Sequence, residues 1–414
     1  MRHSQGLKAR VDAYGHRLSS GEPGRLPVVL VLVAIWAVFE SLNSAFLSPR
    51  NLSNLSVDIV GTGLIAVGII FVLLIGEIDL SVAAVSGLAA TMFAVLNVQY
   101  GMPEWLAVIV GMLCGAAVGA VQGFIIAKVG VPAFVVTLAG LLGWNGLMLY
   151  VLGTSATISL DDKGLVAALT NTYFNHDAVA YGVAALVAGA ILLASYQGRR
   201  RRKAVGMPSR PLGDIWLRTG GVAAIAFTAA YVLNQFQGMP LALLIFLVVI
   251  AGLDLILRHT LYGRKVGALG GGIEATRRAG VNVVRIRISV FVVSGTMAAI
   301  GGLFLASRIT SVSQSSGSAN LLVNAIAAAV IGGTSLFGGR GRTWSALLGM
   351  LVIQSIASGV ALLGVQRAIQ SMITGGVLLA AVVIDSLSRR SRESHSRPSG
   401  PLMPRPGDPS YRGR

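Results

Sequence analysis

The sequence Gly76-Glu77-Ile78-Asp79-Leu80-Ser81 interrupts a long apolar region, with hydrophobic stretches at residues 57–75 before it and 82–96 after it. Inserting a charged side chain at membrane depth costs about 2.5 kcal/mol or more of free energy. The two carboxylates of this stretch must therefore be stabilised by their local surroundings or serve a function. The glycine can end the first helix, and the serine together with the aspartate can cap the next one. Because non-helical backbone cannot face lipid, we expect this break to line a cavity or a cytoplasmic mouth.

The composition indicates a polytopic membrane protein. Of the 414 residues, 54% are hydrophobic and only 12% are charged, compared with about 25% charged residues in an ordinary soluble domain. The net charge of +17 would suggest nucleic acid as the partner of a soluble protein, but here the basic residues cluster in a few loops and both tails, as membrane orientation requires. The strongest cluster, Arg199-Arg200-Arg201-Arg202-Lys203, is typical of a cytoplasmic segment that meets anionic membrane lipid rather than nucleic acid.

Several function classes find no support in the sequence. Cys114 is the only cysteine, so we expect no intramolecular disulfide and no cysteine-based metal site. The five histidines are scattered, and none pairs with another at the spacing of metal ligands. No G-x-x-x-x-G-K-[ST] phosphate loop occurs, so the chain is not expected to hydrolyse nucleotide by that route. We therefore expect no metal, no cofactor and no enzymatic activity of its own.

About twelve apolar stretches alternate with polar loops along the chain. They predict an all-α, polytopic integral membrane bundle with about 10–12 membrane segments, some of them broken or re-entrant. The stretches lie at residues 27–46, 57–75, 81–98, 106–127, 133–152, 178–196, 220–233, 241–257, 288–306, 321–336, 344–363 and 368–384. The predicted division is an N-terminal tail (residues 1–26), a transmembrane domain (27–388) and a disordered basic tail (389–414).

The basic loops set the orientation. With twelve segments they all fall on one side, which predicts that both termini are cytoplasmic. These loops are residues 199–218, 258–287, 340–342 and the tail from 389 onward.

Most notable side chains within the predicted spans have ordinary structural explanations. A glycine every four residues from Gly111 to Gly119 predicts close packing between helices. Asn145, near the middle of its span, is expected to make an interhelical hydrogen bond rather than a ligand contact. Asp254 and Arg258 are four residues apart and are expected to form a local ion pair.

A second apolar region is also interrupted. The stretch 321–336 is short for a full span, and it runs into a glycine-rich segment at residues 332–339. Interrupted segments in both halves of a membrane protein are the best pointer in a sequence to a transport pathway.

Four sequence blocks resemble a known family. Residues 76–82 resemble the G-x-I-D-L-S-V signature of the membrane subunits of ribose- and xylose-type sugar ABC importers. The other blocks similar to this family are residues 131–138, residues 263–281, which resemble its cytoplasmic loop, and residues 325–341. The likeness covers about residues 27–390, so it concerns nearly the whole chain.

The finer features resemble the xylose-importer members most. These features are Glu77 and the extra polar loop and spans between residues 152 and 240. Gly272, Thr276 and Asn324 depart from the family pattern, and they bear on the substrate and on the contacts of the cytoplasmic loop rather than on the class.

The resemblance implies a permease subunit of the cell inner membrane that carries a monosaccharide inward, D-xylose or a related pentose or hexose. Its implied partners are a separate ABC ATPase, an extracytoplasmic sugar-binding protein and a second permease subunit, which can be identical or different, with an identical copy expected. The loop at residues 259–287 is the expected receiver of ATPase motion, with a short helix at residues 274–280 after a sharp turn at 270–272. A plain basic loop that only sets orientation is the alternative.

The candidate site residues form two groups. The ATPase-coupling group comprises Gly270, Gly271, Glu274, Ala275, Arg277, Arg278 and Gly280. The broken-helix or pathway group comprises Gly76, Glu77, Asp79, Ser81, Asn145, Gly332, Gly333 and Thr334. We expect Glu77 and Asp79 to cap the broken helix and to pair near the cytoplasmic mouth rather than to bind sugar tightly.

Two other classes stay open. An ion-coupled secondary transporter would use Glu77 and Asp79, with Glu40 and Asp254, as a proton or cation relay. A membrane receptor or scaffold would depend on no sugar at all. A neighbouring gene for an ATPase and another for a secreted sugar-binding protein would favour the importer.

Overall fold

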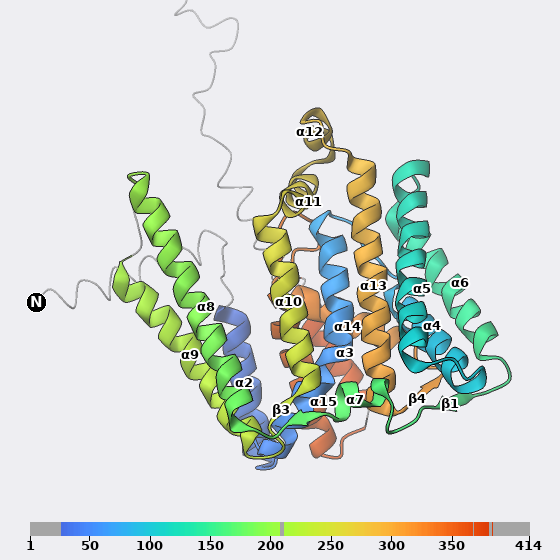
Figure 1. Cartoon of the computed structure of the whole chain (residues 1–414), viewed down its shortest axis with the longest axis horizontal. Helices are drawn as coiled ribbons and strands as arrows, with labels where there is room; N and C mark the ends of the chain where they lie inside the picture. Colours follow the sequence, from blue (N-terminus) through green and yellow to red (C-terminus); the bar gives the residue numbers. More distant parts are fainter. Residues whose placement is uncertain (1–25, 208–210, 367, 381–382, 384–414) are drawn as a thin grey trace, which may run out of the picture.

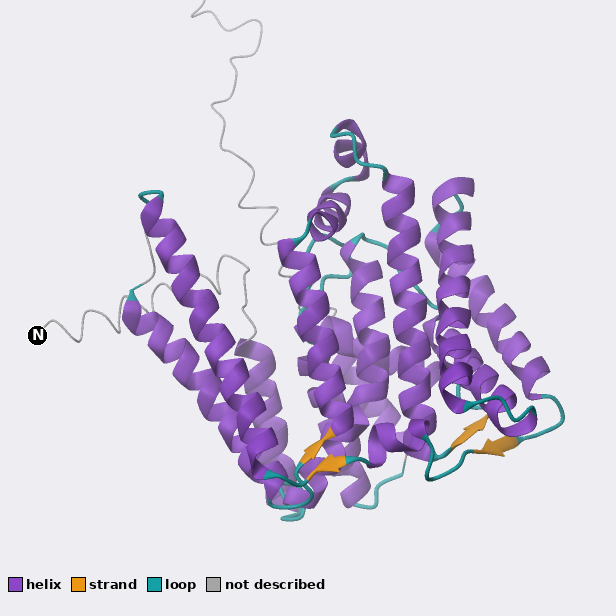
Figure 2. Cartoon of the chain, in the orientation of Figure 1, coloured by secondary structure: helices purple, strands orange, loops and turns teal. Residues whose placement is uncertain are grey.

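The computed structural model describes residues 26–207, 211–366, 368–380 and 383, so both predicted tails lie almost entirely outside the described residues. The described chain is a bundle of helices with very little sheet (Figures 1 and 2). Among the described residues, nine helices are long and apolar enough to cross a membrane. They are α3 (Pro49–Leu74), α4 (Val82–Ala94) with its π-helical end η1 (Val95–Gln99), α5 (Glu104–Phe124) with η2 (Ile125–Val129), α6 (Ala133–Leu152), α8 (Asp177–Ala204), α9 (Leu212–Asn234), α10 (Leu241–His259), α13 (Val283–Ile309) and α15 (Trp344–Leu362).

Three shorter apolar helices complete the bundle. They are α2 (Leu26–Leu42), α14 (Ala319–Ile331) and the helix at Ala368–Ala380. With the nine longer helices they occupy the twelve predicted positions, and the prediction of an all-α polytopic membrane bundle is confirmed. With 13 residues, α14 is too short for a full span.

Several helices are longer than the apolar stretches that predict them. The predicted span at residues 178–196 ends before the basic run, whereas α8 continues through that run to Ala204. Arginine and lysine are good helix formers, and their charges are favourable at a helix C-terminus. Similarly, α3 begins eight residues before the predicted span, where the Ser48 side chain accepts a hydrogen bond from the Asn51 backbone N–H. Hydropathy therefore locates the helices but not their ends.

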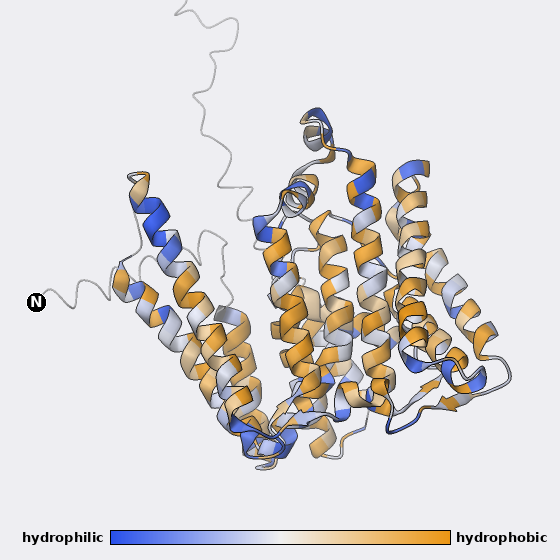
Figure 3. Ribbon diagram, viewed as in Figure 1, coloured by the Kyte–Doolittle hydropathy of each residue, from blue (hydrophilic) through white to orange (hydrophobic). Residues whose placement is uncertain are grey.

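The two ends of the bundle differ in structure. At one end, β1 (Thr157–Ser159) pairs antiparallel with β4 (Ser311–Ser313), and β2 (Tyr173–Phe174) pairs antiparallel with β3 (Met239–Pro240). The helix α7 (Leu165–Asn171) lies at the same end, while α11 (Leu261–Gly271) and α12 (Ile273–Arg278) lie at the opposite end (Figure 1). Hydrophilic residues are concentrated at both ends (Figure 3).

The sequence predicts only a polar loop between residues 152 and 177, whereas the structure has two strands and a helix there. The strand partners come from distant parts of the chain, so no local pattern reveals them. The start of α7 is fixed by Glu104, whose carboxylate accepts hydrogen bonds from the Leu165 and Val166 backbone N–H groups at 2.5 and 2.6 Å.

The core of the bundle surrounds α3, which is buried along almost its whole apolar length. It packs against α13, α14 and α15, and α13 packs in turn against α4 and α5. A β-carbon on Gly115 of α5 would lie 2.6 Å from the Ala299 β-carbon of α13, so only glycine allows these two helices to approach so closely. The predicted packing role of the glycines from Gly111 to Gly119 is confirmed.

In contrast, α8 and α9 form a hairpin whose main packing is between its own two helices (Figure 1). Few of the apolar residues of these two helices are buried in the single chain. Such faces are suited to lipid or to another membrane chain.

Candidate functional site

Three segments that are far apart in the sequence meet at the end of the bundle that carries α11 and α12. They are the loop after α3, the last turn of α11 and the glycine-rich loop after α14. The Gly339 backbone N–H donates a hydrogen bond to the Leu74 carbonyl oxygen at 3.0 Å. We call this meeting point the glycine junction and define it by Gly76, Gly270, Gly338 and Gly339.

The junction requires glycine for two reasons. Gly76 and Gly338 have φ angles of +78° and +88°, a region that other residues rarely adopt. A β-carbon on Gly338 would lie 2.9 Å from the Gly76 α-carbon, and a β-carbon on Gly270 would overlap the Leu74 carbonyl oxygen. Three of the four sequence blocks that resemble the importer family therefore come together at one point, and their glycines permit backbone contact there.

Beside the junction, the two carboxylates of the interrupted stretch have different partners. Glu77 forms an ion pair with Arg287 in the first turns of α13, and its side chain is 9% exposed. Its Oε2 atom has no hydrogen-bond partner among the described residues. Burial raises the pKa of the Glu77 carboxyl, and the Arg287 guanidinium opposes this rise.

Asp79 is the centre of a buried network of hydrogen bonds. Its Oδ1 atom accepts from the Ser81 backbone N–H at 2.9 Å and from the Ser81 hydroxyl at 2.7 Å, while Oδ2 accepts from the Ser294 hydroxyl of α13 at 3.0 Å. Gln122 of α5 contacts the Ser81 hydroxyl at 3.0 Å. Burial raises the pKa of the Asp79 carboxyl, and these hydrogen bonds oppose the rise.

This network corrects one part of the capping prediction. The Ser81 side chain makes no capping hydrogen bond to α4, and the Asp79 carboxylate accepts the Ser81 N–H instead. Glu77 pairs with Arg287 of α13 and Asp79 accepts the Ser81 N–H, while the expected place of these carboxylates near a cytoplasmic mouth stays a prediction. Together these contacts tie the start of α4 to α5 and α13.

The predicted coupling residues lie on α11 and α12, except for Gly280, which follows the end of α12 and has a φ angle of +76°. The predicted short helix is confirmed as α12. Thr276 is its only buried residue. Glu274 and Arg277 form an exposed ion pair of 3.3 Å on this helix. The sharp turn is only partly as predicted, because Gly270 and Gly271 belong to α11 and only Gly272 separates the two helices. The helix α11 lies within residues 259–287, which the sequence analysis predicts to be a loop.

The remaining predicted pathway residues lie in two places. Gly332 packs against the Ser345 carbonyl oxygen near the start of α15, and Gly333 has a φ angle of +97°. The Thr334 hydroxyl is buried without a partner among the described residues. Asn145 is half-buried near Gly317 and makes no side-chain hydrogen bond to another described residue, so the expected interhelical bond is not found.

Two other expectations concern single carboxylates. Asp254 pairs with Arg258 at 2.8 Å, as predicted. The Glu40 carboxylate accepts a hydrogen bond from the Leu47 backbone N–H at 2.8 Å, which ties the turn after α2 to that helix.

Sequence reasoning missed a polar cavity at the other end of the bundle. A cavity of about 740 Å³ is lined by residues of α3, α13, α14, α15 and the helix at Ala368–Ala380. We call it the outer cleft and define it by Asn51, Asn54, Asp58, Arg308, Asn324 and Gln354. Asp58 within the predicted span 57–75 and Gln354 within the span 344–363 are the signals that could have revealed it.

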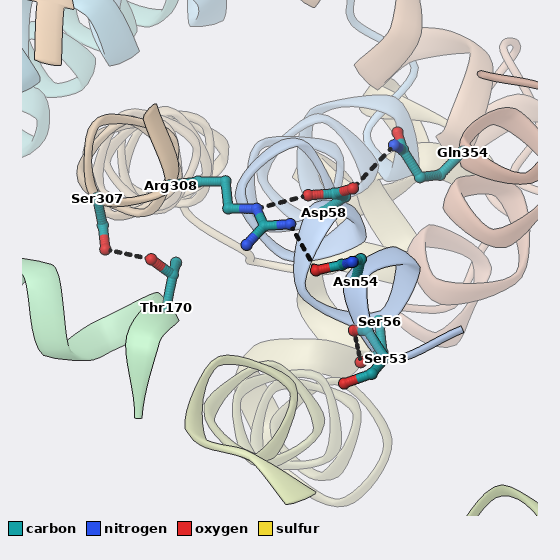
Figure 4. A network of polar contacts seen from close by, with 8 residues as sticks. All are labelled: Ser53, Asn54, Ser56, Asp58, Thr170, Ser307, Arg308 and Gln354. Atoms are coloured by element: carbon teal, nitrogen blue, oxygen red, sulfur yellow. Dashed lines mark hydrogen bonds and ion pairs between the residues drawn. The ribbon is translucent and has the colours of Figure 1, made fainter. Parts of the chain in front are cut away.

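One ion pair, between Arg308 and Asp58, connects the helices that line the outer cleft. Arg308 Nε donates to Asp58 Oδ1 at 2.8 Å, and Arg308 Nη2 donates to Asn54 Oδ1 at 3.1 Å (Figure 4). Gln354 Nε2 lies 3.5 Å from Asp58 Oδ2, on the opposite side of the carboxylate. The contacts join α3, α13 and α15.

The apolar helices of the described residues define a multi-pass membrane protein. Residues 51–382 match the family model described as "Branched-chain amino acid transport system / permease component", and the chain belongs to this family of permease components.

Individual relatives are similar over almost their full length. The xylose transport system permease protein XylH of Escherichia coli K12 is 35% identical over 88% of this chain and 92% of that protein. The ribose import permease protein RbsC of Haemophilus influenzae is 32% identical over 86% of this chain and 91% of that protein. The L-arabinose ABC transporter permease protein AraH of Azospirillum brasilense is 30% identical over 89% of this chain and 90% of that protein. No solved structure gave a match to the chain.

Proposed function

We propose that the chain is the membrane-spanning permease subunit of an ABC importer that carries a monosaccharide into the cell. The observation that carries the proposal is the similarity to a xylose permease over 88% of this chain. The substrate is D-xylose or a related pentose or hexose, since the ribose and arabinose permeases are similar at somewhat lower identity. A separate ATPase supplies the energy, and an extracytoplasmic binding protein delivers the sugar.

The shape of the cytoplasmic end supports the ATPase part of the proposal. α12 projects beyond the ends of the long helices (Figure 1), and all of its residues except Thr276 are at least partly accessible in the single chain. The adjoining α11 is anchored to α3 and to the glycine-rich loop through Gly270. A displacement of α12 by the ATPase would therefore be transmitted to the interrupted segments through rigid contacts.

The contacts of Glu77 and Asp79 favour a structural role over an ion relay. Glu77 faces Arg287, and both Asp79 oxygens accept hydrogen bonds from serine groups. A relay needs carboxylates that exchange protons with water along a path, whereas these two hold α4 and α13 in place.

Orientation and assembly follow from the same proposal. The end with α11, α12 and the basic end of α8 lies in the cytoplasm of a cell with an inner membrane, as do both termini. A second identical copy completes the importer. Co-purification of two differently tagged copies from one membrane extract tests this point, and recovery of only one tag would contradict it.

Reconstitution tests the function itself. The chain is placed in proteoliposomes with a sugar-importer ATPase and a sugar-binding protein from the same organism, and uptake of radiolabelled D-xylose, D-ribose and L-arabinose is measured. We expect uptake only with all components and ATP. Uphill uptake by this chain alone, or uptake abolished by an uncoupler while ATP is maintained, would instead establish an ion-coupled transporter.

A further inference from the structure

The outer cleft has the size and chemistry of a small-molecule site. Its volume of about 740 Å³ lies within the range of roughly 300–1,000 Å³ that is usual for ligand pockets. It opens at the end opposite α11 and α12, because Asn51 lies in the first turn of α3 and Arg308 lies in the last turn of α13. In the proposed orientation this end faces the outside of the cell.

The lining of the cleft is polar but carries no net charge. Among the described lining residues, Asp58 and Arg308 carry the only charges, and they neutralise each other. Each of their side chains is still about one-third exposed, at 31% and 32%. The cleft therefore offers accessible hydrogen-bonding groups without attracting an ion of either sign.

The amide side chains around this pair have unused hydrogen-bonding capacity. Asn54 uses its oxygen for Arg308, and Gln354 uses its nitrogen for Asp58, which leaves the Asn54 nitrogen and the Gln354 oxygen free of protein partners among the described residues. The side chains of Asn320 and Asn324, also in the lining, have no hydrogen bond to another described residue. Donors and acceptors that are close together suit hydroxyl groups, since each hydroxyl both donates and accepts.

We propose that the outer cleft is a low-affinity docking site for a neutral monosaccharide, in which Asn54, Asp58 and Gln354 hydrogen-bond its hydroxyl groups. The proposal rests on the proposed function and adds where the sugar first contacts the permease after leaving its binding protein. A dissociation constant in the millimolar range is expected, because weak binding allows the sugar to move on.

The single cysteine of the chain makes a direct test possible. In a Cys114→Ser background, Ala361→Cys places a thiol in the cleft lining, and Gln235→Cys places a control thiol at an exposed position directly after α9. Spheroplasts that contain the permease and its ATPase are treated with a membrane-impermeant maleimide, either alone or in the presence of D-xylose, sucrose or the anion D-gluconate. We expect D-xylose to slow labelling at Ala361→Cys roughly threefold at twice its dissociation constant, and to leave Gln235→Cys unchanged.

A second substitution separates docking in the cleft from an indirect change elsewhere. Adding Gln354→Ala to the Ala361→Cys chain removes one hydrogen-bonding side chain and should raise the D-xylose concentration for half-protection roughly fivefold to tenfold. The control Gln237→Ala, exposed after α9, should leave it unchanged. A purely structural role of Gln354 would not move this concentration.

The outcomes are decisive in both directions. No labelling of Ala361→Cys from outside, equal slowing by sucrose or gluconate, or no effect of Gln354→Ala would overturn the docking site. ATP-driven uptake, measured in the same spheroplasts after purified binding protein is added, reports on the proposed function separately. Normal uptake without protection of the cleft would reject the docking site alone, while absence of uptake of any monosaccharide would reject the importer.

Discussion

Gly270 at the end of α11 lies against the carbonyl oxygen of Leu74 at the end of α3, so closely that a β-carbon at position 270 would overlap this oxygen. The same oxygen accepts the hydrogen bond from Gly339. One backbone atom thus connects the end of the central helix with the element proposed to receive ATPase motion and with the loop after α14. This contact gives the junction a rigidity that each segment would lack alone.

We predict that Gly270→Ala separates α11 from α3. Because the overlap is with backbone rather than a flexible side chain, the cost should be about 1–3 kcal/mol in stability, with a marked loss of sugar uptake. Gly271→Ala is the matched control, since a β-carbon there meets nothing within 4 Å. Thermal unfolding in detergent and uptake in the reconstituted importer measure both effects, and equal behaviour of the two variants would disprove the role of the contact.

Loss of Arg287 should be costly because it leaves Glu77 buried without its ion-pair partner. Arg287→Ala is expected to destabilise the protein by about 3 kcal/mol, because removing one partner of a buried ion pair leaves the charge of the other without compensation. The control is Arg285→Ala, two residues earlier and exposed. A thermal midpoint of Arg287→Ala equal to that of Arg285→Ala would contradict the prediction, and Glu77→Gln combined with Arg287→Ala should recover part of the loss.

Asp79 is predicted to be sensitive to a change of a single atom. Asp79→Asn replaces an acceptor by a donor that faces donor groups of Ser81 or Ser294, and the expected cost is about 1–3 kcal/mol. Ser294→Ala removes one donor and should cost less. Thr296→Ala, on the same helix but bonded only to its own backbone, serves as the control in the same unfolding measurement. No difference between the Ser294 and Thr296 variants would argue against the network.

Glu274→Lys tests the proposed coupling role of α12. Glu274 is 69% exposed, so the substitution should leave folding and membrane insertion unchanged while ATP hydrolysis no longer drives uptake. A bulky Ala275→Trp change should act in the same way. Asp162→Lys makes the same change of charge on the exposed opposite end and is expected to retain transport. The prediction fails if Glu274→Lys retains both sugar-stimulated ATPase activity and uptake.

The sequence by itself determined the twelve membrane segments, the two interrupted regions, the helix α12 and the family. Long apolar stretches, glycine breaks and basic loops act locally along the chain, so these features can be read from neighbouring residues. Local spacing also sufficed for the pair Asp254–Arg258, one helical turn apart.

Only the tertiary structure decided which of these segments meet. Arg308 and Asp58 are 250 residues apart, and nothing in either local sequence indicates the other. The same is true of Glu77 with Arg287, of the paired strands and of the glycines at the junction. These contacts depend on which helix faces adjoin and how closely backbones approach, and hydropathy along a chain contains neither kind of information.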